Sequence, residues 1–282
     1  MGSECQIRST RHRDAIFAGN RATGRVELAV AAGRAGSQRT RVHEAGSLRA
    51  RFPHAAGGAL EAVLVNVAGG MTGGDRFGFD IEVGAGASLT VTTAAAEKIY
   101  RSLGPDCEIA VKLEVGAGGA LAWLPQETIL FDRARLRRSI DVELARDARL
   151  TLAEGGVFGR TAMGETVKSG SYCDRWRVRV GGSLLFADQV RLDGGIAQTL
   201  TERAVAGGGA AAASVLQIPG DEESVAAVRA VQQDALGEIG ASAWNGLALI
   251  RLVAADGAAL RHDLMRVLMA LGAGPLPRLW LN

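Results

Sequence analysis

The stretch LEVGAGGALAWLPQETILFDRAR, residues 113–135, decides the fold, because neighbouring stretches repeat its opening. One copy, IEVGAGASL, begins at Ile81 and another, VELARDARL, begins at Val142, so successive copies start 32 and 29 residues apart. A fourth and weaker copy, VRVGGSLL, begins at Val178. Alternating apolar residues on both sides of a small turn indicate paired short strands, and a repeat of this length is typical of stacked coils. The sequence predicts a mainly β fold of stacked or coiled strand layers, β-helix-like or sandwich-like.

A polar segment follows the second predicted strand of each copy. If the copies stack, these segments stack as well, and several carboxylates then lie in one column or channel. The function has to explain this feature. The polar residues of the three segments are Thr92, Thr93, Glu97 and Lys98, then Gln126, Glu127 and Asp132, then Glu154, Arg160 and Glu165.

Two further positions are open to more than one interpretation. Asp75 follows the glycine-rich stretch AGGMTGG, where the backbone can approach a neighbouring segment or an ion, but it also suits an Asx turn that opens the next strand. Glu154 lies between apolar residues and glycines, so it needs an ion or a cationic partner if it is buried. Arg160 is the partner that the sequence suggests.

The composition describes an ordinary globular chain. Of its 282 residues 48% are hydrophobic and the net charge is +2, which favours neither disorder nor nucleic-acid binding. Three widely spaced cysteines predict reduced thiols rather than a disulfide framework. We find no signal-like apolar segment and no apolar run of about 18 residues, so we expect a cytoplasmic protein without a membrane anchor.

We expect one domain over residues 1–282, with a loose N-terminal arm over residues 1–20 and a helix-strand-helix cover over residues 219–272. In the cover, Asp221 is the N-cap of a helix over residues 222–239, and residues 244–253 form a strand. Asp256 caps a second helix that ends at Gly272. Both helices are predicted to cover one face of the β body.

Two other patterns bear on partners. Arg133, Arg135 and Arg137 alternate with smaller or apolar residues, which predicts a strand with a basic face, either simply solvated or able to dock an acidic partner. The second predicted helix carries a Leu and Met stripe that includes Leu264 and Leu268. Such a stripe favours core packing over a partner groove.

Missing motifs narrow the chemistry. The chain has no P-loop and no G-x-S-x-G, and its histidines are isolated, so a tight imidazole or thiolate metal site is not expected. A metal would therefore meet carboxylates, carbonyls and water, which bind borderline ions weakly. This suits an ion that passes through the protein better than a tightly bound cofactor.

Five stretches, in order, carry a resemblance to a known family: NVAGGMTGGDRF, TTAAAEKIYRS, WLPQETILFDRARLRR, EGGVFGRTAMGE and PLPRLW. From about Thr23 to its end, the chain resembles the urease accessory proteins called UreD, or UreH in some organisms. The resemblance implies a nickel-insertion chaperone rather than an enzyme, with a mostly β, helix-capped body. It also implies partners: UreF, the GTPase UreG, apo-urease and a possible second copy of the chain. Nickel, as the transferred ion, is expected to cross an internal tunnel.

The resemblance also suggests residues. The carboxylates inside the matching motifs would line or gate the nickel path, and the C-terminal helices would form part of the UreF surface. Ala94 departs from the expected pattern, in which glutamine often follows the two threonines. The path residues are Asp75, Glu127, Asp132, Glu154 and Glu165, and the partner residues are Arg133, Arg135, Arg137, Leu264 and Leu268.

Two alternatives remain at this point. A β-helical enzyme acting on polysaccharides would place carboxylates in a groove as acid and base. A plain assembly scaffold would use the same carboxylates only to balance arginines. The scaffold predicts that substitutions at Asp75 or Glu154 affect folding without a selective effect on nickel transfer.

Overall fold

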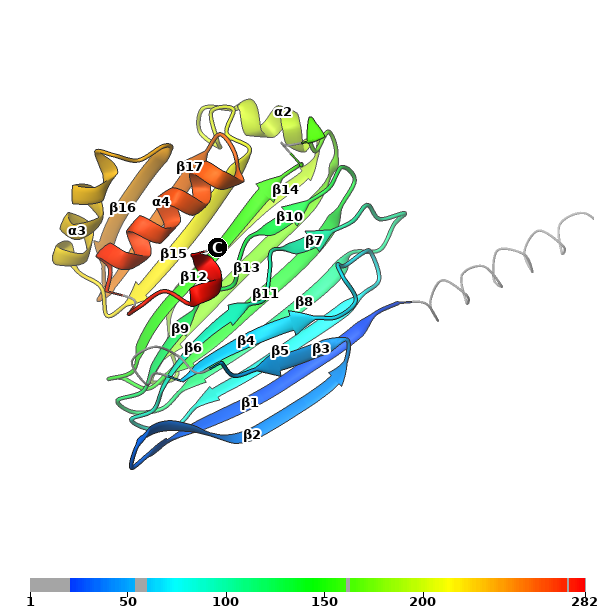
Figure 1. The fold of residues 1–282 in the computed structure, drawn as a ribbon. Coiled ribbons are helices and arrows are strands. Elements are labelled where there is room, and N and C mark those ends of the chain that lie inside the picture. Colours follow the sequence, from blue (N-terminus) through cyan, green and yellow to red (C-terminus); the bar gives the residue numbers. More distant parts are fainter. Residues whose placement is uncertain (1–20, 54–59, 161–162, 273, 282) are drawn as a thin grey trace, which may run out of the picture.

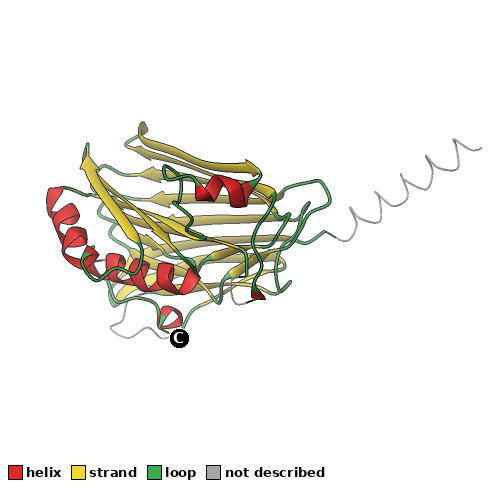
Figure 2. Ribbon diagram, turned by 90° about the horizontal axis from the view of Figure 1, so that it is seen from above, coloured by secondary structure: helices red, strands yellow, loops and turns green. Residues whose placement is uncertain are grey.

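The computed structural model describes residues 21–53, 60–160, 163–272 and 274–281. The predicted N-terminal arm over residues 1–20 lies outside these ranges. Two sheets face each other in the described part (Figure 1). Seen from above, most strands run along a common direction and the longest helices lie along the outside of them (Figure 2).

The seven-stranded sheet has a parallel centre with an antiparallel hairpin at each side. Its order is β14-β13-β11-β8-β5-β1-β2. The bounds are β1 (Thr23–Gly33), β2 (Gly36–Gly46), β5 (Arg76–Val83), β8 (Cys107–Val115), β11 (Arg135–Leu144), β13 (Gly170–Val180) and β14 (Ser183–Gly194).

The ten-stranded sheet runs β16-β17-β15-β12-β9-β6-β4-β3, with two short strands, β7 and β10, beside this path. The bounds are β3 (Leu48–Arg51), β4 (Glu61–Asn66), β6 (Ser88–Thr93), β7 (Glu97–Ile99), β9 (Ala120–Trp123), β10 (Thr128–Leu130), β12 (Arg149–Phe158), β15 (Ala211–Ile218), β16 (Glu238–Trp244) and β17 (Leu247–Ala254).

The repeat in the sequence is the coil of the fold. Each of the first three copies contributes one strand to each sheet, as β5 and β6, β8 and β9, and β11 and β12. Their first residues, Ile81, Leu113 and Val142, are in-register neighbours in the seven-stranded sheet. The prediction of stacked β coils is confirmed.

The fourth copy departs from the coil. Val178 is in register with Val142, but the strand that follows turns back as β14 within the same sheet. The reason lies in the turn: only Gly181 and Gly182 separate β13 from β14, both at positive φ (56° and 82°). A two-residue turn of this kind closes a hairpin, whereas the longer turns of the other copies cross to the second sheet.

The three polar segments also stack. Strand β7 pairs with β10, and β10 pairs with the end of β12, which aligns Glu97 with Thr128 and Thr128 with Gly156. This short third face closes one side of the coil between the two sheets.

Helices α3 (Glu222–Gln232) and α4 (Gly257–Ala270) pack beside each other on the outer face of the ten-stranded sheet (Figure 1). Asp221 and Asp256 accept backbone N–H groups as the two N-caps, as predicted. The first helix ends at Gln232, earlier than predicted. A short helix, α2 (Ile196–Thr201), and a 3-10 turn, η2 (Arg278–Trp280), complete the fold.

The strand predicted over residues 244–253 is β17 from residue 247 on, whereas residue 244 ends β16, a strand that was not predicted. The two strands form a hairpin. Asn245 and Gly246 form its turn at positive φ (50° and 79°), as Asn-Gly favours. This hairpin extends the ten-stranded sheet, so the C-terminal cover is a helix, a hairpin and a helix.

Two hydrophobic cores result. One lies between the sheets, and the other lies between the ten-stranded sheet and helices α3 and α4. Strand β12 serves both, because its alternate side chains face opposite ways: Leu152 enters the first core and Ala153 the second. In the described ranges, none of the helices is long and apolar enough to cross a membrane.

Candidate functional site

A small cavity of about 40 Å³ lies between the two sheets, beside the third face of the coil. One part of its wall is apolar, with Phe79, Val111 and Trp123 among its side chains. The other part is polar. The cavity volume is enough for one or a few water-sized groups. The polar lining residues are Asn66, Thr93, Glu97, Gln126, Thr128, Arg138 and Glu154.

Arg138 is the centre of the polar wall. It occupies an apolar position in the alternation of β11, between Leu136 and Ile140, so its side chain points between the sheets and is buried. Its in-register neighbour on β13 is Asp174. The guanidinium donates from Nε to Asp174 Oδ1 (3.1 Å) and from Nη2 to Asp174 Oδ2 (2.6 Å), a bidentate contact.

The second carboxylate on Arg138 comes from the opposite sheet. Arg138 Nη1 donates to Glu154 Oε2 and also to Thr128 Oγ1 (3.3 Å). Trp123 Nε1 donates to the other oxygen, Glu154 Oε1 (2.9 Å). One buried guanidinium therefore ties the two sheets together. The prediction that Arg160 is the partner of Glu154 is wrong, because Arg160 pairs with Glu165 instead.

Buried polar groups surround this ion pair. Tyr172 accepts from Arg138 Nη2 (3.2 Å), and Trp176 Nε1 donates to Asp174 Oδ1 (3.1 Å). Two carboxylates share one guanidinium, so the cluster carries one negative charge when both are ionised. Burial raises the pKa of Glu154 to about 7, against the lowering effects of Arg138 and the Trp123 hydrogen bond.

Glu97 is the second carboxylate of the cavity. It starts β7, and Asn66 Nδ2 at the end of β4 donates to Glu97 Oε2 (3.2 Å). Burial raises the pKa of this carboxyl as well. The cavity thus holds two carboxylates that resist losing a proton in the absence of a cation.

Glu127 lies behind the polar wall, toward α4. Arg261 of α4 donates to both of its oxygens (3.0 and 2.9 Å) and to Gln126 Oε1 (2.5 Å). Gln126 in turn donates to the Thr93 carbonyl (3.0 Å), so it joins the cavity wall to the helix. Trp280 lies under the Arg261 guanidinium, 5.7 Å from its ring centroid, and closes this side.

The other predicted path residues lie elsewhere. Asp75 is buried and accepts the backbone N–H groups of Ala22 (2.9 Å) and Thr72 (2.7 Å), which secures the turn before β5. Asp132 accepts the Ser169 N–H (3.1 Å) in a loop, and Glu165 pairs with Arg160 at the surface. The five carboxylates therefore do not converge. Across the described ranges, no three His, Cys, Asp or Glu side chains form a metal-binding group.

Some of the predicted partner residues lie at the surface and others do not. Arg135 and Arg137 face outward from β11, as the alternation predicts, whereas Arg133 precedes the strand in a turn at φ 62°. Leu264 and Leu268 are buried under α4 in the second core, so their side chains do not reach the surface. The stripe on α4 is core packing.

Sequence reasoning missed Arg138 and Asp174, and it placed Glu97 in the first polar segment without naming it among the path residues. A signal was present for Arg138, because Leu136, Arg138, Ile140 and Val142 share one face of a strand. A charged residue on an apolar face needs a buried partner.

Comparison with known proteins agrees with the resemblance in the sequence. A family model described as UreD urease accessory protein matches residues 22–281. A protein of Rhodopseudomonas palustris named urease accessory protein UreD is 54% identical over 276 residues, which cover 98% of this chain and 96% of the relative. One of the same name from Bradyrhizobium diazoefficiens is 51% identical over 282 residues and covers all of both chains.

Proposed function

The chain belongs to the UreD family of urease accessory proteins, and we propose from this premise that it passes nickel to apo-urease through its internal cavity. The family places the chain in urease maturation. The passage of nickel is our proposal, and so is its assembly in the cytoplasm with UreF, UreG and the urease subunits, as the resemblance implies. A homodimer within that assembly remains a prediction.

The observation that carries the proposal is the pair of carboxylates, Glu97 and Glu154, that line one small cavity between the sheets. Burial raises the pKa of both carboxyls, because Glu154 is cut off from the solvent that would stabilise its charge and half-buried Glu97 is partly cut off from it. A divalent cation supplies that stabilisation, so entry of the ion and loss of a proton are coupled. Oxygen ligands without an imidazole or thiolate hold borderline metals weakly, so the ion can leave again.

The size of the cavity favours an ion over a larger substrate. About 40 Å³ accommodates one or a few water-sized groups. A carbohydrate enzyme needs an open groove with its two carboxylates on either side of a sugar unit. The geometry therefore supports transfer of an ion rather than the polysaccharide alternative.

The experiment is urease activation in cells that express the urease subunits and the other accessory proteins, with and without this chain. We expect urease to assemble in both cases and to contain nickel only when the chain is present. Activity and nickel per purified urease are the readouts. Full nickel content without the chain would refute the proposed function.

Substitution of the cavity carboxylates separates nickel passage from a plain scaffold. Glu97→Gln removes one negative charge and touches neither Arg138 nor its partners, so it should leave the fold intact. We expect about tenfold slower nickel loading, the usual scale for groups that tune a metal site. Glu82→Gln on the outer face of β5, where the side chain is 54% exposed, is the matched control. Equal loading by both variants would support the scaffold.

A further inference from the structure

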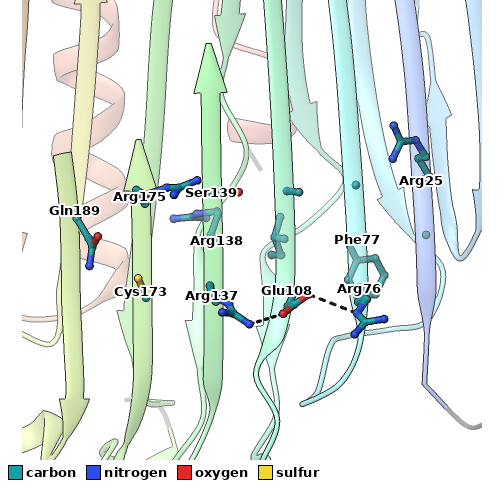
Figure 3. A pocket seen from close by; sticks show the side chains of 14 residues that line it. Arg25, Arg76, Phe77, Glu108, Arg137, Arg138, Ser139, Cys173, Arg175 and Gln189 are labelled. Carbon is teal, nitrogen blue, oxygen red and sulfur yellow. Dashed lines mark hydrogen bonds and ion pairs between the residues drawn. The ribbon is translucent and has the colours of Figure 1, made fainter. Parts of the chain in front are cut away.

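The outer face of the seven-stranded sheet carries a groove of about 580 Å³ (Figure 3). It lies on the opposite side of this sheet from the internal cavity, because successive side chains of a strand point to opposite faces. Arg137 and Arg138 illustrate this: the first lies at the rim of the groove and the second points inward.

The groove crosses the strands along one register row. Gly78 of β5, Ala110 of β8 and Ser139 of β11 are in-register neighbours and form its floor. The row continues to Arg25 of β1 at one end and to Arg175 of β13 at the other. The row on one side of the floor carries long side chains and lines the groove as its wall.

The wall and the ends are rich in arginine. The wall is the row Arg76, Glu108, Arg137, in which a single carboxylate serves two guanidiniums. The three rows from β1 to β13 hold six basic and four acidic side chains. The basic residues are Arg25, Arg76, Lys112, Arg137, Arg175 and Arg177, and the acidic ones are Glu27, Asp80, Glu108 and Asp141.

The ion pairs of the groove are exposed and exchangeable. The side chains of Arg25, Arg76 and Arg137 are 50%, 76% and 59% exposed. Arg175 approaches Asp141 only to 3.6 Å. Surface pairs of this kind contribute little to stability, so a ligand with its own carboxylates can replace them at small cost.

We propose that this groove binds an extended acidic segment of a partner protein. Adjacent strands lie about 4.8 Å apart, so the four spacings from Arg25 to Arg175 span about 19 Å. An extended chain covers that length in about six residues. The segment that fits best has acidic side chains about six residues apart, one for each terminal guanidinium, with small residues between them over the floor. The excess of positive charge in the three rows favours such a ligand.

The test uses the full chain and three labelled octapeptides. EEGSGSEE places acidic pairs at the two ends, GSEEEEGS has the same composition with the acids clustered, and KKGSGSKK reverses the charge. Fluorescence anisotropy should show that EEGSGSEE binds at least about tenfold more tightly than KKGSGSKK and more tightly than GSEEEEGS. Binding should weaken as salt rises, because the contacts are exposed charges.

Variants locate the binding in the groove. Arg25→Glu with Arg175→Glu reverses both ends and should weaken EEGSGSEE about tenfold. Ala110→Phe fills the floor from an exposed position without changing charge and should also abolish binding. The controls are Arg203→Glu with Arg229→Glu and Ala226→Phe, all at exposed positions away from the groove. Thermal melting of each variant checks that the fold is retained.

Cross-linking in the assembled urease maturation complex tests whether the groove is occupied there as well. Lys112 lies on the outer face in the row next to the floor. A carbodiimide should therefore couple its amine to a carboxylate of the occupant, and Ala110→Phe should prevent this coupling. Equal binding of acidic and basic peptides, unchanged binding by the groove variants, or coupling of Lys112 to a second copy of this chain would each overturn the proposal. Nickel loading by Glu97→Gln tests the cavity separately, so either proposal can fail alone.

Discussion

Arg138→Met tests the account of the buried ion cluster. The side chain is about 4% exposed and makes five hydrogen bonds, two of them to Asp174 and one to Glu154. Methionine fills similar space but leaves both carboxylates buried and unpaired. Removing one member of a buried ion pair costs about 3–5 kcal/mol. For a chain of this length we expect the melting temperature to fall by about 5–10 °C.

The pH dependence of this loss identifies its cause. Arg138 lowers the pKa of Glu154, so its removal raises that pKa further above the unfolded value. A carboxyl with a raised folded pKa stabilises the fold at low pH and loses that contribution as pH rises through the folded pKa. The free energy of unfolding lost on Arg138→Met should therefore be smaller at pH 5.5 than at pH 8, by at least about 1 kcal/mol.

Arg137→Met is the matched control, because the neighbouring side chain is 59% exposed and pairs only at the surface. We expect a change within about 0.5 kcal/mol. Denaturant unfolding and thermal melting at both pH values measure the two variants. A loss below about 1 kcal/mol for Arg138→Met, or an equal loss at pH 5.5 and pH 8, would refute the reasoning.

Three other predictions follow from buried groups. Trp280→Ala removes a buried ring whose Nε1 donates to Thr92 Oγ1 and to the Leu124 carbonyl, so it should cost about 3–5 kcal/mol in melting experiments, whereas exposed Leu281→Ala should cost little. Asp263→Ala leaves the N–H groups of residues 236 and 237 without their acceptor, so it should cost about 1–3 kcal/mol and speed their hydrogen exchange, unlike exposed Asp234→Ala. In the parent protein, the raised pKa of Glu154 should lower the free energy of unfolding by up to about 3 kcal/mol as pH rises from about 4.5 to 7. Glu154→Gln cannot ionise, so this decrease should be absent from the variant. Denaturant titration of both proteins over this pH range measures the difference. A parallel pH profile for the two would contradict the raised pKa.

The coil was predictable because its signal is local. Apolar alternation, the small turn and the spacing of about 30 residues all lie within one copy and its neighbour. The register of Ile81, Leu113 and Val142 follows from them. The N-caps Asp221 and Asp256 are equally local, since each bonds a backbone N–H three residues ahead.

The errors were also local in origin. The two-residue Gly181–Gly182 turn makes a hairpin of the fourth copy. The Asn-Gly pair at residues 245–246 joins the predicted strand, β17, to β16, which was missed. Both signals stand in the sequence and were not used. Turn length decides whether the chain crosses between the sheets or folds back within one of them.

The sequence by itself determined the strands of the coil and their stacking order, because these depend on patterns a few residues long. Only the tertiary structure decided which buried charges meet. Arg138 contacts Glu154 from the opposite sheet and Asp174 from a neighbouring strand, 16 and 36 residues along the chain. Many carboxylates were available to it. The crossing of the chain between two sheets selects these two, because pairing depends on positions in space that no local pattern encodes.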